Sequence, residues 1–196
     1  TGYSYGIERD YATVKYNSDG VKQWVSRYNG PLNFDEEAFS ISVDGSGNSY
    51  VTGYSMSDVT GPDYLTIKYN SAGDSVWVKR YSSPGYQYDA ANSLSIDSSG
   101  NVYVTGVSSI GGGNFDYATI KYNSAGDTVW VRKYNGPGDS FDQANSIVTD
   151  LSGNVYVTGF STDSLYYYDY ATIKYNSDGD QQWISRYNGT GNLADY

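Results

Sequence analysis

The chain has 196 residues, a net charge of −10 and a pI near 4.2. Such an acidic chain disfavours nucleic acid and anionic membrane surfaces as partners, because both select for basic patches. Cysteine and histidine are absent, which excludes disulfides, zinc–thiolate sites and Ser-His-Asp or Cys-His catalysis within this chain. No apolar run approaches the roughly 20 residues that span a bilayer, so we expect no membrane insertion.

A unit of 53 residues recurs along the chain without drift. Its best-defined stretch is Asp116–Tyr134, DYATIKYNSAGDTVWVRKY, and the tryptophans Trp24, Trp77, Trp130 and Trp183 keep the same spacing. A fixed period of this size indicates a repeat architecture in which each unit packs on its neighbours.

Each copy contains four short segments that are typical of strands, since they are rich in Val, Ile, Thr, Tyr and Trp and lie between turn residues. In the third complete copy these segments are Ala144–Asp150, Asn154–Gly159, Asp169–Tyr175 and Gln181–Tyr187. The turns Asp150–Gly153 and Asn176–Gly179 place Asp or Asn first and Gly last, which favours a tight hairpin closed by Gly at positive φ. No window has a helical apolar period, so we expect helices to be absent or trivial.

Four antiparallel strands in about 50 residues make one propeller blade. A solenoid is the alternative, but its coils are usually shorter and lack two hairpins per unit. The pattern predicts one all-β propeller repeat region over residues 1–196, with blades at about 38–81, 91–134 and 144–187. Residues 1–28 hold parts of an earlier blade, with two outer strands in 9–28, and residues 188–196 lead into a missing strand. We therefore expect a segment of a larger propeller, with the natural amino terminus and any secretion signal outside it.

The pattern SIxxDxSGNVYVTG followed by DYATIKYNxxGDxxW resembles the SBBP-type β-propeller repeat of secreted bacterial proteins, and more distantly the NHL repeat. The resemblance covers essentially the whole chain. It implies that the ANSIxxD strand lies innermost in each blade and the Trp strand outermost. It also implies a secreted or cell-surface location.

The connections after the second and fourth strands vary between copies, and in a meander they share one face. Variable loops on a constant scaffold are where binding residues usually lie, and these loops are rich in Tyr, Ser, Gly, Asn and Asp. The candidate binding residues are Asp58, Tyr86, Tyr88, Phe115, Phe141, Tyr166, Tyr167 and Tyr168. The same aromatics could instead cap the blade ends and shield the core.

Several acidic and basic sets have both a functional and a structural interpretation. The set Asp10, Asp63, Asp116 and Asp169 could ring a calcium ion, but we favour a structural role in which it accepts backbone hydrogen bonds. For the D-x-S-G-N turns at Asp44, Asp97 and Asp150 we favour Asx-turns over calcium loops. We expect the run Asp35-Glu36-Glu37 to be solvated. We expect the mid-strand lysines Lys15, Lys68, Lys121 and Lys174 to pair across strands with acidic or Tyr partners.

No catalytic constellation stands out, so we predict no enzyme activity, no catalytic residues, no metal site and no cofactor, with calcium possible but not favoured. The main hypothesis is a non-catalytic extracellular scaffold that binds a protein or polysaccharide at the cell surface through the variable loops. One alternative is a glycosidase-like propeller enzyme with paired carboxylates. Another is a structural subunit of an array or filament that self-associates through its incomplete blade.

Overall fold

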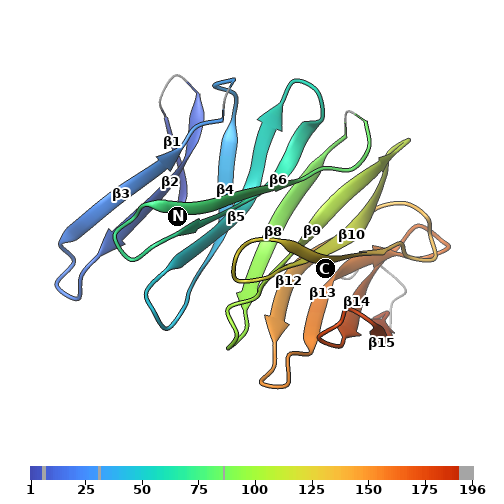
Figure 1. The fold of residues 1–196 in the computed structure, drawn as a ribbon. Coiled ribbons are helices and arrows are strands. Elements are labelled where there is room, and N and C mark those ends of the chain that lie inside the picture. The colour runs from blue at the N-terminus through green and yellow to red at the C-terminus, as the bar shows by residue number, and fades with distance from the viewer. Residues whose placement is uncertain (6–7, 31, 86, 190–196) are drawn as a thin grey trace. The chain divides into compact units, whose positions relative to one another are not determined.

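The computed structural model describes residues 1–5, 8–30, 32–85 and 87–189 of the chain. Within these ranges the chain forms 15 β-strands and no helix, as the repeat pattern predicts (Figure 1). The strands form four antiparallel sheets, and consecutive strands are neighbours in each of them. In the same ranges no helix is long and apolar enough to cross a membrane. The expected all-β blade architecture is confirmed.

The first sheet contains β1 (Gly2–Tyr5), β2 (Arg9–Tyr16) and β3 (Lys22–Tyr28). The second contains β4 (Glu36–Val43), β5 (Ser49–Ser57), β6 (Gly61–Tyr69) and β7 (Ser75–Tyr81). The third contains β8 (Asp89–Ile96), β9 (Val102–Gly111), β10 (Asn114–Tyr122) and β11 (Thr128–Tyr134). The fourth contains β12 (Asp142–Thr149), β13 (Val155–Thr162), β14 (Tyr168–Tyr175) and β15 (Gln181–Tyr187). The first sheet therefore has β1 in addition to the two strands expected in residues 9–28.

One type of tight turn closes the hairpins at one end of the sheets. Between β14 and β15, Asn176 Oδ1 accepts hydrogen bonds from the backbone N–H groups of Asp178 (3.1 Å) and Asp180 (2.7 Å). Gly179 closes this turn at φ +81°, a conformation that costs glycine little. The same bonds and a positive-φ glycine recur in the turns that begin at Asn17, Asp44, Asn70, Asp97, Asn123 and Asp150. The expected Asx-turns are confirmed.

The chain divides into two contact units, Thr1–Ala91 (unit 1) and Asn92–Tyr196 (unit 2). In each unit a buried tyrosine joins two sheets. In unit 1 the Tyr11 hydroxyl of β2 donates to the Leu65 carbonyl of β6 at 3.1 Å. In unit 2 the Tyr117 hydroxyl of β10 donates to the Ala171 carbonyl of β14 at 3.3 Å. The same residue of the repeat thus fastens one blade to the next within both units.

A tryptophan of the fourth strand packs on the next blade's turn. The indole N–H of Trp24 donates to the Ser71 carbonyl at 3.1 Å, and that of Trp130 donates to the Ser177 carbonyl at 3.2 Å. A Cβ on Gly179 would lie only 2.9 Å from the Trp130 ring. Glycine is therefore required in this turn both for its backbone conformation and for the close approach of the ring.

Candidate functional site

The variable connections of unit 2 gather at one end of its sheets. These connections run from β9 to β10, from β11 to β12 and from β13 to β14. Phe115 N donates to the Ser140 carbonyl at 2.9 Å, and Gly138 N donates to the Thr162 carbonyl at 3.0 Å. Loops that are far apart in the sequence are thus tied together by backbone bonds, which holds their side chains in a defined arrangement.

Four aromatic side chains meet at this end of unit 2: Phe115, Phe141, Phe160 and Tyr168, which we call the aromatic cluster. Phe141 lies at its centre, with ring centroids 5.0 Å from Phe115 and 5.5 Å from Phe160. Tyr168 contacts Phe160 edge-on at 4.9 Å. All four rings are half-buried, so the cluster both shields the ends of the strands and keeps part of its surface in solvent. The candidates Phe115, Phe141 and Tyr168 therefore lie together.

Tyr166 occupies a turn position that the seven tight turns above give to glycine. In the loop between β13 and β14, Asp163 Oδ1 accepts backbone bonds from Leu165 and Tyr167, both at 2.8 Å. Tyr166 N donates to the Asp163 carbonyl at 3.0 Å, as glycine does in the other turns. Its φ is +65°, and its side chain is 73% exposed. A bulky residue in this region is strained by about 1–3 kcal/mol, and such strain concentrates at functional sites.

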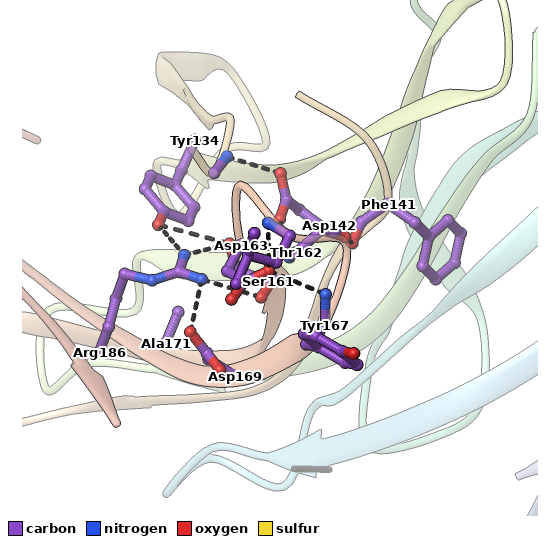
Figure 2. Close-up of polar contacts among 12 residues, drawn as sticks. Tyr134, Phe141, Asp142, Ser161, Thr162, Asp163, Tyr167, Asp169, Ala171 and Arg186 are labelled. Carbon is purple, nitrogen blue, oxygen red and sulfur yellow. Dashed lines mark hydrogen bonds and ion pairs between the residues drawn. The ribbon is translucent and has the colours of Figure 1, made fainter. Parts of the chain in front are cut away.

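Asp142 braces the loops beneath the aromatic cluster. Its carboxylate accepts backbone hydrogen bonds from Gly136 at 2.6 Å and from Thr162 at 2.9 Å, as Figure 2 shows in part. The hydroxyl of Thr162 in turn donates to the carbonyl of Phe141. A Cβ on Gly136 would lie 2.0 Å from Ser161 Oγ, so only glycine lets the two loops approach this closely. The backbone at Phe141 is therefore held from both sides.

Arg186 of β15 connects the same region to the body of the sheets. Its guanidinium donates to the Tyr134 hydroxyl at 2.9 Å, to the Ser161 carbonyl at 3.0 Å and to the Asp169 carboxylate at 3.1 Å (Figure 2). The planar five-donor group of arginine suits such a fork of acceptors. The floor of the variable-loop end is thus a rigid polar network, and the side chains above it are the ones available to a ligand.

A buried carboxyl group lies at the start of β10. Asp116 is 5% exposed, and its Oδ1 has no hydrogen-bond partner among the described residues. Burial raises the pKa of Asp116 from 3.8 to about 6, the charges of Asp142 and Asp139 add to this, and Lys133 opposes it. Ionisation of Asp116 at neutral pH is therefore costly to the folded state.

Two further candidates, Asp58 and Tyr88, belong to unit 1. Asp58 lies beside a cavity of about 440 Å³ at the variable-loop end of that unit. Tyr88 is partly exposed and packs on Tyr54 with a centroid distance of 6.5 Å. Tyr86 lies outside the described residues. Tyr166 and Tyr167 lie at the tip of the β13–β14 loop in unit 2, so the candidates divide between the two units.

The expectation that Asp35-Glu36-Glu37 is solvated is wrong. Arg9 binds the Asp35 carboxylate at 2.5 Å and that of Glu37 at 3.2 Å. Glu36 is fully buried, and its Oε1 accepts a hydrogen bond from Ser55 Oγ at 2.9 Å. The run lies at the start of β4, where successive side chains point to opposite faces of the sheet. Glu36 therefore points into the packed interior, whereas Asp35 and Glu37 point toward Arg9, which is distant in sequence.

The expectation that the four-copy aspartate set accepts backbone hydrogen bonds is wrong for two members, because the carboxylates of Asp63 and Asp169 bind side chains. Asp63 accepts a hydrogen bond from Thr60 Oγ1 at 2.7 Å and lies 3.5 Å from Arg80, so side chains replace the expected backbone donors. The backbone bonds go instead to the acid at the start of the first strand, as in the 2.7 Å bond from Ser83 N to Asp89. No three acidic side chains of the described residues are grouped closely enough to hold a metal ion.

The sequence pattern does not by itself identify two features of the structure, one in the aromatic cluster and one that recurs in both units. Phe160 lies in a variable segment but is not among the candidate binding residues. Its position directly after the YVTG strand is the one signal for it, and in the structure its ring stacks on Phe141. The acids Glu36, Asp89 and Asp142 recur at one repeat position, and that recurrence was the available signal.

The predicted pairing of mid-strand lysines with tyrosine is confirmed for three of them. Lys68, Lys121 and Lys174 lie 5.1–5.3 Å from the rings of Tyr50, Tyr103 and Tyr156.

The comparisons with known proteins agree with the blade architecture. The model of the SBBP β-propeller repeat matches residues 23–58, 76–114 and 129–167, which together are more than half of the chain. A crystal structure of a eukaryotic initiation factor is similar in fold, with a TM-score of 0.51 and 9% sequence identity over 91% of this chain. This chain covers 43% of that structure, which is less than half its length.

A protein provisionally described as a gluconolactonase also aligns, with a TM-score of 0.39 and 11% identity over 81% of this chain and 55% of its own. No curated protein sequence matches the chain significantly. The likeness to the initiation factor therefore concerns the fold alone, whereas the three matches of the family model are specific to this repeat. The chain belongs to the SBBP β-propeller repeat family.

Proposed function

We propose that this chain is a non-catalytic extracellular interaction module that binds a polysaccharide at the variable-loop end of unit 2. The observation that carries the proposal is Tyr166, an exposed aromatic residue held at positive φ where the equivalent turns have glycine. A strained turn with an exposed ring is not explained by packing. It is explained if the ring is used to contact a ligand.

The surroundings of Tyr166 favour a sugar ligand. The half-exposed rings of the aromatic cluster, with Tyr167 in the same unit, supply rigid apolar faces on which a pyranose ring can stack. Asp163 and the polar loops provide acceptors and donors for hydroxyl groups. The network around Arg186 holds the supporting backbone in place, which reduces the entropic cost of binding.

The glycosidase alternative receives less support from the site. A retaining or inverting glycosidase needs two carboxyl groups that reach the scissile bond. In unit 2 both oxygens of Asp142 accept backbone hydrogen bonds, and Asp116 is almost completely buried. We therefore assign these acids to the scaffold rather than to chemistry.

The test is a glycan array probed with the chain and with Tyr166→Gly. We expect the variant to lose about tenfold or more in affinity for the glycans that the parent chain binds, because one stacking ring is removed. Its free energy of unfolding should stay the same or rise by about 1 kcal/mol, since glycine adopts positive φ freely. Loss of binding without loss of stability separates a contact role from a structural one.

A matched control is Tyr16→Ala, which removes a tyrosine of 58% exposure at the opposite, tight-turn end of β2 in unit 1. This variant should bind as the parent chain does. Unchanged glycan binding by Tyr166→Gly, or no glycan bound by the parent chain on a broad array, would contradict the proposal. Fractionation of the producing cells tests the location, since the protein should be found in the surface or secreted fraction.

A further inference from the structure

Unit 1 contains two adjoining hollows at its own variable-loop end. The first, of about 440 Å³, is lined by Glu8, Phe34 and Asp35, and the second, of about 320 Å³, by Leu32, Asp63 and Arg80. Met56, Ser57 and Asp58 line both, so the two form one acidic pocket. Backbone bonds fix its walls, since Met56 N donates to the Asp35 carbonyl at 3.0 Å.

The charges of this acidic pocket are not balanced. Asp35 is neutralised by Arg9 at 2.5 Å. Glu8 and Asp58, by contrast, have neither a hydrogen bond nor an ion pair with any described residue, and both are exposed at the pocket. Two carboxylates without cations therefore face one hollow, in a chain whose net charge is −10.

A third carboxylate lies deeper and is incompletely satisfied. Asp63 lines the second hollow, is 4% exposed, and its Oδ1 has no hydrogen-bond partner in the described part of the chain. Its Oδ2 accepts a hydrogen bond from Thr60 Oγ1 at 2.7 Å, and Arg80 lies at 3.5 Å. A buried carboxylate oxygen without a donor is costly, and Asp63 adds negative charge beneath the second hollow.

The remaining lining is apolar. Leu32 and Phe34 are each about 40% exposed, and with the thioether of Met56 they form a flexible hydrophobic wall. The described residues hold no group of three acids close enough for a metal ion, which points to an organic cation rather than an inorganic one. A charged head with an apolar stem matches both parts of the lining.

We propose that the acidic pocket of unit 1 binds a lysine side chain of a partner protein. The alkyl stem packs on Phe34 and Met56, and the ammonium group donates hydrogen bonds to Glu8 and Asp58, which both line the first hollow. The guanidinium of Arg80 limits the pocket to one such group, because a second cation would be repelled. This site uses other residues and another ligand chemistry than the sugar site of unit 2.

The probe is a blocked pentapeptide with one central lysine, added to the ¹⁵N-labelled whole chain and followed by NMR chemical shifts. The backbone signals of residues 56–58 should move in a saturable way. The double variant Glu8→Gln, Asp58→Asn should weaken binding by about tenfold or more, because charge-assisted hydrogen bonds are lost. Both residues are exposed, so this variant should fold, and its circular dichroism spectrum should equal that of the parent chain.

Two controls separate a site from general attraction. The same peptide with an acetylated lysine should give no shifts, and Asp19→Asn, which removes an exposed acid at the tight-turn end of unit 1, should leave the affinity unchanged. Equal weakening by Asp19→Asn, equal binding of the acetylated peptide, or shifts outside the pocket would overturn the proposal. Stronger binding of glucosamine than of the lysine peptide would overturn it as well. None of these results bears on the sugar site, because Tyr166 lies in unit 2.

Discussion

At the scale of single residues, the recurring acids of this chain have opposite electrostatic roles. Burial opposes the ionisation of Asp97, but bonds from Asn101, Tyr103 and the backbone outweigh it and lower the pKa of this group. Asp116 has an orphan oxygen, and burial raises its pKa to about 6. The number of donors that reach a carboxylate, rather than the residue type, decides whether its ionised form is stabilised.

Replacement of Asp116 by Asn should stabilise the folded chain at neutral pH. The folded-state pKa of Asp116 is about 6 against an ordinary value of 3.8, so the ionised group destabilises the fold by about 2–3 kcal/mol above pH 6. This cost disappears as the pH falls through 6 toward 4, because the folded state takes up the proton first. Urea unfolding at pH 7.5 should therefore favour the variant, and the difference should close near pH 4.

The control for this prediction is Asp19→Asn, an exposed acid in a tight turn. It should change the free energy of unfolding little and with no dependence on pH between 4 and 7.5. If Asp116→Asn destabilises the chain at pH 7.5, or if its effect does not vary with pH, the raised pKa is not the cause of the cost.

At the scale of secondary-structure elements, the tight turns do more than reverse the chain. The turn of one blade receives the tryptophan of the preceding blade, as Trp130 donates to the Ser177 carbonyl and lies against Gly179. The hairpin and the contact between sheets are therefore built from the same residues. Local turn chemistry thereby sets how one blade packs on the next.

Two glycine substitutions separate these roles in unit 2. Gly179 and Gly153 both close tight turns at positive φ, at +81° and +76°. A Cβ on Gly179 would lie 2.9 Å from the Trp130 ring, whereas one on Gly153 would meet only Ser177 Cβ at 3.4 Å. Both alanine variants should lose about 1 kcal/mol from backbone strain, and Gly179→Ala should lose about 1–3 kcal/mol more from overpacking. Equal losses in chemical denaturation would show that the Trp130 contact adds nothing.

At the scale of the whole chain, the repeat makes stability a sum of local contributions. In repeat proteins each unit contacts its neighbours, so a defect spreads only as far as the packing is cooperative. In this chain the residues group into two contact units, 1–91 and 92–196, so we expect a defect to stay within the unit that contains it. The clusters around Tyr11 in unit 1 and around Tyr117 in unit 2 share no residue.

Hydrogen exchange in Gly179→Ala should show how far a defect spreads. Under native conditions we expect faster exchange in the amides of β12–β15 and β10–β11, which lie in unit 2 with the defect. The strands β2, β5 and β6 of unit 1 should keep the protection they have in the parent chain. A uniform loss of protection throughout the chain would show instead that the two units unfold as one.

Much of this structure follows from local sequence. The strands, the Asx-turns and the closing glycines of the tight turns depend on neighbouring residues, so the 53-residue pattern predicts them. The gathering of the variable loops within each unit follows from meander topology. The cluster of Phe115, Phe141 and Tyr168 was predictable as a region, since all three lie in those loops.

The sequence by itself determined the repeat, the all-β blades and the loops that carry the candidate sites, because these depend on local periodicity and turn chemistry. Only the tertiary structure decided which partners each side chain meets. Burial of Glu36 and the orphan oxygens of Asp63 and Asp116 depend on packing between segments far apart in the chain. Identical letters at equivalent positions also have different partners: Asp169 pairs with Arg186 on the adjacent strand of its own blade, where the blade of Asp116 has Lys133.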